Sequence, residues 1–83
     1  MKILYFAWLR LRTGTGEEEV EPPTSVNDVA SLIEWLKTRG PGYTEALKDI
    51  STIRIAVNQE FADLTTPLKP GDEVALFPPI TGG

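Results

Sequence analysis

The carboxyl end of the sequence carries the residue types that are best suited to chemistry. The last residues read FPPITGG, so that Pro78 and Pro79 follow Phe77 and the chain ends on Gly82 and Gly83. Proline holds φ near −65° and has no N–H, which stops strand pairing and favours a stiff, extended spacer. Glycine has no side chain and fits a slot no wider than the backbone. We therefore expect the α-carboxylate of Gly83 to be presented at the tip of a narrow arm.

This arm, residues 78–83, is the predicted functional segment of the protein. From Phe77 to Gly83 an extended chain reaches about 20 Å, which is enough to project the terminus clear of a small domain. A free carboxylate is a poor acyl donor, so acyl chemistry requires activation by a partner, most simply as a mixed anhydride with phosphate. The alternative is an inert polar end, because two terminal glycines also arise by chance. The stiff FPPIT segment before them favours a carrier that delivers its carboxyl group.

Composition excludes most other kinds of site. The 83 residues include no cysteine and no histidine, so the chain has no thiolate nucleophile and no imidazole or thiolate for a transition metal. The net charge of −4 and the scattered lysines and arginines argue against nucleic acid and favour a basic partner surface. The apolar run 3–9 is too short to span a membrane, and no secretory signal is present. We expect a cytoplasmic protein that binds no metal and no cofactor.

Four polar stretches are better explained by structure than by catalysis. Consecutive strand carboxylates point to alternate faces, so Glu17–Glu19 suit an exposed sheet edge better than a cation site. The stretch Thr13–Gly16 lacks the lysine and the following helix of a phosphate-binding loop and is expected to be a turn. Asn58-Gln59 and Asp72-Glu73 are expected to shape turns.

The first third of the chain predicts a β-hairpin. Residues 2–9 are rich in aromatic and aliphatic side chains and predict a strand that is apolar on both faces. The turn at 13–16 then leads to a return strand over 17–21, which Pro22-Pro23 ends.

One main helix follows this hairpin. Ser25 is the expected N-cap, with Asp28 in a capping-box-like position. Gly40-Pro41 is the expected end, and residues 43–48 add a further helical turn. The apolar residues spaced as one helical stripe are Val29, Leu32, Ile33 and Leu36.

The last third predicts short strands at 53–57 and 73–77, and a strand or bend at 61–64. A single helix covers one face of so small a sheet, which leaves the other, partly apolar face free for an interface. The alternative is that Phe6 and Trp8 pack under the loop before Ile53. The predicted core is Ile3, Tyr5, Val29, Leu32, Ile33, Leu36, Ile55, Val57, Leu68, Val74 and Leu76.

Several of these segments together resemble a known family. Val57-Asn58-Gln59, the final stretch PGDEVALFPPITGG (70–83) and the opening strand 2–8 are similar to the small subunit of molybdopterin synthase, the sulfur carrier called MoaD. The likeness runs in order over nearly the whole chain. It implies an α+β fold, the ubiquitin-like β-grasp, with a mixed four- to five-stranded sheet and one main helix on one face. A single domain, 1–83, is then expected, with 78–83 as its projecting tail.

The resemblance also implies a mechanism. An E1-like adenylating enzyme uses ATP to activate Gly83, and a persulfide sulfur donor converts the carboxylate to a thiocarboxylate. The carrier then docks on the large subunit of molybdopterin synthase, in an expected heterotetramer, and donates sulfur to cyclic pyranopterin monophosphate. It implies that Thr81 and Gly82 thread into the partner and that Phe6, Phe61 and Phe77 lie on the partner-facing surface. The chain itself is then not an enzyme.

Two other functions stay open at this stage. The thiamine-pathway sulfur carrier also ends in Gly-Gly, but it is usually shorter and lacks the FPPIT lead-in. A ubiquitin-like modifier would instead be conjugated through Gly83 to lysines of other proteins. The resemblance assigns no role to Trp8 or to the stretch 10–12.

Overall fold

The computed structural model describes residues 1–79, whose strands form one five-stranded sheet. The order across the sheet places the last strand at its centre and pairs it in parallel with the first; the other pairs are antiparallel. The sheet is therefore mixed, as predicted. Its strands are β1 (Lys2–Tyr5), β2 (Glu17–Glu19), β3 (Arg54–Val57), β4 (Glu60–Ala62) and β5 (Glu73–Phe77), in the spatial order β2-β1-β5-β3-β4.

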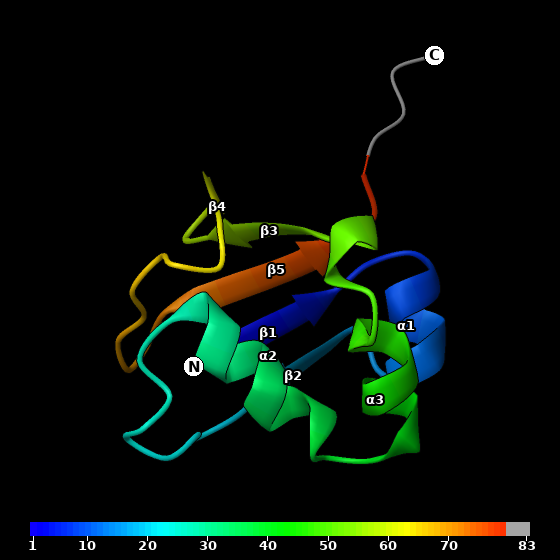
Figure 1. Cartoon of the computed structure of the whole chain (residues 1–83), viewed down its shortest axis with the longest axis horizontal. Coiled ribbons are helices and arrows are strands. Elements are labelled where there is room, and N and C mark those ends of the chain that lie inside the picture. Colours follow the sequence, from blue (N-terminus) through cyan, green and yellow to red (C-terminus); the bar gives the residue numbers. More distant parts are fainter. Residues whose placement is uncertain (80–83) are drawn as a thin grey trace.

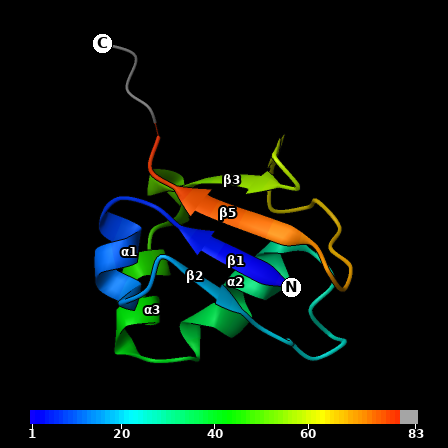
Figure 2. The same ribbon diagram turned by 180° about the vertical axis from the view of Figure 1, so that it is seen from behind.

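The helices leave one side of this sheet uncovered. They are α1 (Trp8–Thr13), α2 (Val29–Lys37), α3 (Pro41–Leu47) and a 3₁₀ turn, η1 (Ile50–Thr52). Figure 1 shows α2 and α3 in front of the sheet, with α1 beyond the end of β1. From behind, in Figure 2, no described helix lies in front of β1, β3 or β5. We call this side the open face. The predicted main helix on one face is confirmed as α2, and α1 is an additional helix.

The core fills the space between the sheet and the helices. Every residue of the predicted core is buried, including the whole apolar stripe of α2. Further buried residues come from α1, from α3 and from the segments that flank the strands. These are Leu9, Val20, Ala46, Leu47 and Ile53.

The predicted first strand is too long. Strand β1 ends at Tyr5, and Ala7, with φ 55° and ψ −132°, turns the chain into α1. Leu9 lies in this helix and is fully buried, so the second half of the apolar run contributes to the core as part of a helix and not of a strand. Gly14, at φ 82°, ends α1 and donates its N–H to the carbonyl of Arg10. The predicted antiparallel pairing of the first two strands is confirmed. The prediction that residues 13–16 form the hairpin turn is wrong, because α1 lies between the strands and ends there.

The predicted start of α2 is also too early in the sequence. Asp28, not Ser25, is the N-cap: its Oδ1 accepts from the Ser31 N–H at 2.8 Å, and Ser31 Oγ accepts from the Asp28 N–H at 3.2 Å. The next two N–H groups donate to carbonyls of the loop before Leu68, Val29 to Thr66 and Ala30 to Leu64. The helix begins where these acceptors are available.

The predicted end of α2 lies too late in the sequence. The helix ends at Lys37 with Thr38 as its C-cap, and Gly40 and Pro41 instead begin α3. Proline suits the first turn of a helix, so the Gly-Pro pair serves as a start signal here.

The second half of the sheet follows its prediction closely. Strand β5 has the predicted bounds, and β3 differs by one residue. Asn58 and Gln59 have φ values of 51° and 71°, the left-handed pair that a two-residue hairpin turn requires.

A close contact between α1 and α3 makes Gly42 a sensitive position. A Cβ at Gly42 would overlap the carbonyl oxygen of Arg12, which is backbone and cannot swing away. An exposed helical Gly→Ala change normally stabilises a helix by about 1 kcal/mol. Here we expect Gly42→Ala to lower the free energy of unfolding by about 1–2 kcal/mol, because the overlap forces the helices apart. Urea unfolding measures this.

The matched control for this substitution is Gly16→Ala. A Cβ there meets only the movable side chain of Arg10, so a smaller loss is expected. An equal effect of the two substitutions would contradict the packing argument.

Candidate functional site

The site begins where the chain leaves the central strand. Strand β5 ends at Phe77, in register with Arg54 on β3, and the Phe6 N–H donates to the Leu76 carbonyl at 3.1 Å on the other side. Pro78 and Pro79 continue beyond the strand as half-buried residues outside any helix or strand, and Figure 1 shows them running away from the sheet. The predicted tail residues Thr81, Gly82 and Gly83 lie outside the described residues.

An apolar patch surrounds this exit point on the open face. The register places Leu4, Ala75, Ala56 and Phe61 in one row across β1, β5, β3 and β4. Phe61 is 84% exposed. We call this surface the open-face patch: Leu4, Phe6, Ala56, Phe61, Ala75 and Phe77.

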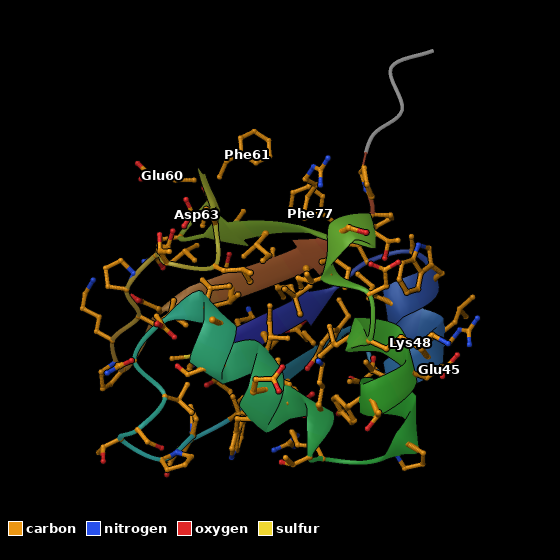
Figure 3. All side chains as sticks on the ribbon, in the orientation of Figure 1. Glu45, Lys48, Glu60, Phe61, Asp63 and Phe77 are labelled. Carbon is orange, nitrogen blue, oxygen red and sulfur yellow. The ribbon has the colours of Figure 1, made fainter. Side chains whose placement is uncertain are left out.

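The three predicted interface residues all contribute to this patch. Phe61 and Phe77 lie with their rings 6.2 Å apart, and Figure 3 shows both on the side of the molecule from which the tail departs. Phe6 is 48% exposed at the end of β1. Trp8 behaves differently, since it packs against the core and lines a shallow pocket with Asp49 and Thr52 before β3. The buried alternative is therefore correct for Trp8 and wrong for Phe6.

Strand alternation explains why these side chains face outward. In β5 the fully buried Val74 and Leu76 point to the helices, so Ala75 and Phe77 point to the open face. In β4, Phe61 pairs with Ala56 on the outer side.

Side-chain hydrogen bonds around Asn58 hold the start of β5, the end away from the tail. The Asn58 side chain donates to Asp72 Oδ1 at 3.0 Å and accepts from the Glu73 N–H at 3.0 Å. Asp72 is 5% exposed, and its other carboxylate oxygen accepts from the Lys69 N–H at 2.9 Å. The hydrogen bond from Asn58 is the main cause that lowers the pKa of Asp72. The expectation that these residues shape turns is confirmed.

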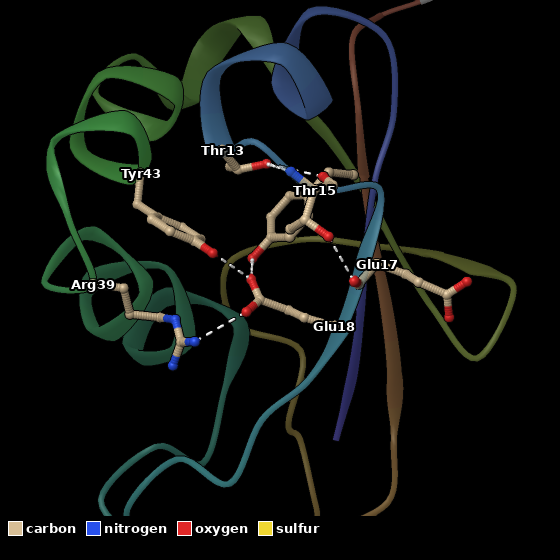
Figure 4. Close-up of polar contacts among 7 residues, drawn as sticks. Thr13, Thr15, Glu17, Glu18, Arg39 and Tyr43 are labelled. Atoms are coloured by element: carbon tan, nitrogen blue, oxygen red, sulfur yellow. Dashed lines mark hydrogen bonds and ion pairs between the residues drawn. The ribbon is translucent and has the colours of Figure 1, made fainter.

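The sequence analysis did not predict a partly buried network around the Glu18 carboxylate. Glu18 accepts hydrogen bonds from the hydroxyls of Tyr5 at 2.8 Å and Tyr43 at 2.7 Å and from the guanidinium of Arg39 at 2.9 Å, as Figure 4 shows. It joins edge strand β2 to β1 through Tyr5, to α3 through Tyr43 and to the segment between α2 and α3 through Arg39. Burial, followed by the bond to Glu18, raises the pKa of both tyrosines.

A signal for the inward position of Glu18 was present in the sequence. In a strand of three glutamates the middle one points opposite to its neighbours, and Glu18 is in register with the buried Ile3. Glu17 and Glu19 are exposed, as predicted for an edge.

Within residues 1–79, no group of three or more acidic side chains is placed to hold a metal ion. None of the helices described here has the length and apolar character needed to cross a membrane.

Comparison with protein families decides the relationship. The ThiS family matches residues 3–83, which is nearly the whole chain. The chain belongs to the ThiS family. Within this family it is similar to a relative from Escherichia coli (strain K12) called molybdopterin synthase sulfur carrier subunit, at 39% identity over 100% of this chain and 99% of the relative. The human protein of the same name is 35% identical, over 100% of this chain and 93% of the relative.

Solved structures confirm that this ThiS-family chain has the ubiquitin-like β-grasp fold. Putative molybdopterin converting factor subunit 1 from Pyrococcus furiosus is 36% identical, with a TM-score of 0.77 and 95% of each chain covered. A chain in the complex of subunits 1 and 2 of molybdopterin-converting factor from Helicobacter pylori 26695 is 28% identical, with a TM-score of 0.66, covering 99% of this chain and 96% of that one. Small archaeal modifier protein 1 from Methanosarcina acetivorans is 26% identical, with a TM-score of 0.76, covering 99% and 94%.

Proposed function

We propose that this chain is the sulfur-carrying subunit of molybdopterin synthase in molybdenum cofactor biosynthesis. The observation that carries the proposal is the exit of the tail: the central strand runs into Phe77-Pro78-Pro79 beside an exposed apolar patch. Relatives named molybdopterin synthase sulfur carrier subunit, matched over their full length, support it. In this function the reactive group is the terminal carboxyl of Gly83.

The proposed chemistry proceeds in steps that partner proteins catalyse. The Gly83 carboxylate attacks the α-phosphorus of ATP on an E1-like enzyme, which forms the acyl adenylate and releases pyrophosphate. The terminal sulfur of a persulfide donor then attacks the acyl carbon and AMP leaves. A second thiol of the donor attacks the resulting acyl disulfide, which releases the thiocarboxylate and leaves the donor oxidised to a disulfide. The loaded carrier gives this sulfur to cyclic pyranopterin monophosphate.

The folded domain positions the tail and does not catalyse. The open-face patch docks on the large subunit, with Phe6, Phe61 and Phe77 as contacts, while Thr81 and Gly82 lead Gly83 into that subunit's active site. We propose a heterotetramer in the cytoplasm, with ATP used by the activating enzyme and no cofactor held by this chain. The solved complex of the Helicobacter pylori factor supports the large-subunit partner.

Intact-mass analysis tests this function. Incubation with ATP, an activating enzyme and a persulfide donor should first yield the Gly83 acyl adenylate and then the mass change of one oxygen replaced by sulfur. The control is a chain that lacks Gly83, whose described fold should be unchanged because β5 ends at Phe77. An intact chain that is never adenylated by an enzyme that loads another carrier would contradict the proposal.

A ubiquitin-like modifier is the second candidate function. The similarity to small archaeal modifier protein 1 supports it. Isopeptide-linked ladders through Gly83 on other proteins would favour this candidate, as would a failure of the thiocarboxylate to supply sulfur to a pterin. The thiamine-pathway alternative is tested by offering the loaded carrier to a thiazole-forming enzyme.

A further inference from the structure

Two charged side chains stand at opposite ends of the open face. Arg54 is in register with Phe77, at the end where the tail leaves, and Glu73 begins β5 at the other end. Each precedes a buried core residue, Ile55 or Val74, so both point outward. Among the described residues neither has an ion-pair partner within 4.0 Å, whereas Lys2 on the same face is paired with Glu17 at 3.2 Å.

Their separation prevents these charges from neutralising each other. Phe77 and Glu73 are four residues apart on β5, so the backbone positions that carry the two charges lie about 13 Å apart along the strand direction at ~3.3 Å per residue. This exceeds the Debye length of about 8 Å at physiological ionic strength. The surface between them is apolar, with Ala56 and Ala75 at its centre.

Lys2 is in register with Glu73 at the far end, but its ammonium is paired with Glu17, and the amine of Met1 is paired with Glu19. Glu73 therefore leaves a net negative charge at this end, whereas Arg54 makes the end beside the tail positive.

Strand pairing holds the backbone of both residues in place. Asn58 donates its N–H to the Glu73 carbonyl at 2.8 Å, and its side chain accepts from the Glu73 N–H. Arg54 pairs with Phe77 in the β3–β5 ladder. The positions of the two residues along the strands are therefore set by the fold.

We propose that Arg54 and Glu73 set the direction in which the larger partner subunit docks on the open face. The partner then presents an apolar surface, a carboxylate beside the slot that admits the tail, and a cationic group about 13 Å away, matching the strand geometry. If the carrier docked after a rotation of 180°, charges of the same sign on the carrier and the partner would face each other. The tail would then point away from the slot. This inference rests on the proposed function and adds the charge pattern of the partner.

A second copy of this chain is the other occupant that such a face could take. A half turn about Ala75 would bring Arg54 of one copy over Glu73 of the other. However, five strands about 4.8 Å apart and about 16 Å long give a footprint of roughly 400 Å², about half of the ~800 Å² per partner that stable complexes bury. A partner that also encloses the tail adds the missing area, so we favour the larger subunit.

Binding kinetics of charge-reversed variants test this inference. Association with the cognate large subunit is measured for the unaltered chain, Arg54→Glu, Glu73→Arg and the double variant, at about 0.05 M and about 0.5 M salt. We expect each single reversal to slow association roughly tenfold at low salt and much less at high salt. The controls are Lys48→Glu, at the C-cap of α3, and Glu34→Arg, on α2. They make the same changes in net charge at exposed positions away from the open face.

The possible outcomes distinguish a failure of this inference from a failure of the proposed sulfur-carrier function. Equal effects of Arg54→Glu and Lys48→Glu would overturn the charge inference while leaving the proposed function standing. No binding by the unaltered chain would overturn both. Analytical ultracentrifugation of the carrier alone tests for a second copy. If the same reversals weaken self-association and leave large-subunit binding unaffected, the charges serve a second copy and the inference is overturned.

Discussion

Replacing Phe61 with serine is expected to weaken binding to the large subunit by about 30-fold or more, a loss of at least about 2 kcal/mol. Phe61 is the most exposed aromatic ring of the open-face patch, and it extends the apolar surface of Phe77 at the root of the tail. Aromatic side chains that become fully desolvated at the centre of an interface carry much of its binding energy. Isothermal titration calorimetry against the large subunit measures the effect.

Because Phe61 is exposed, this substitution should change binding without changing the stability of the fold. Because the ring is 84% exposed in the free chain, its loss should change the free energy of unfolding by no more than about 0.5 kcal/mol. Leu11→Ser is the matched control, since Leu11 is 82% exposed on α1, away from the open face. Equal binding losses for the two variants would show that docking does not use the open-face patch.

Replacing Glu18 with alanine is expected to lower the free energy of unfolding by about 2–3 kcal/mol. The substitution removes the acceptor of three hydrogen bonds and leaves the 2%-exposed Tyr5 with an unsatisfied hydroxyl. Glu18→Gln keeps an acceptor without the charge and should show a smaller loss. Urea unfolding measures both variants, and Glu19→Ala on the exposed side of β2 is the control.

The same network predicts a loss of stability at alkaline pH. The pKa values of Tyr5 and Tyr43 are raised in the folded state, by burial and by the bond to Glu18. The folded chain therefore holds these protons more tightly than the unfolded chain, so the contribution is complete below about pH 10 and falls as pH rises further. A Glu18→Ala chain that matches Glu19→Ala in stability, with the same alkaline decline as the unaltered chain, would show that the network contributes little.

The parts of the fold that follow a single periodicity were predictable from the sequence. Residues 73–77 alternate between buried and outward side chains, and α2 has one apolar stripe, so each fits only one kind of element. The run 3–9 fits both kinds, since a short, wholly apolar segment suits a buried strand or a buried helix. Its division into β1 and α1 depends on the positive φ of Ala7, which composition does not indicate.

The candidate site was predictable to a similar extent. Phe6, Phe61 and Phe77 were expected on one surface, and the register of four strands brings them to the open face. The Glu18 network was not expected, because its donors Arg39 and Tyr43 lie 21 and 25 residues away and meet Glu18 only after α2 and α3 have packed. The roles of Thr81, Gly82 and Gly83 stay predictions, since these residues lie outside the described part of the chain.

The position of β5 has a consequence for biosynthesis. Strand β5 lies between β1 and β3 and is the last strand described along the sequence. During translation the edge of β1 that pairs with β5 therefore stays unpaired until residues 73–77 have been made. Such long-range pairing is slow to form. A nascent chain that stops early has no centre to its sheet and is exposed to proteases. Completion of the sheet therefore requires that synthesis has reached Phe77, where the arm begins.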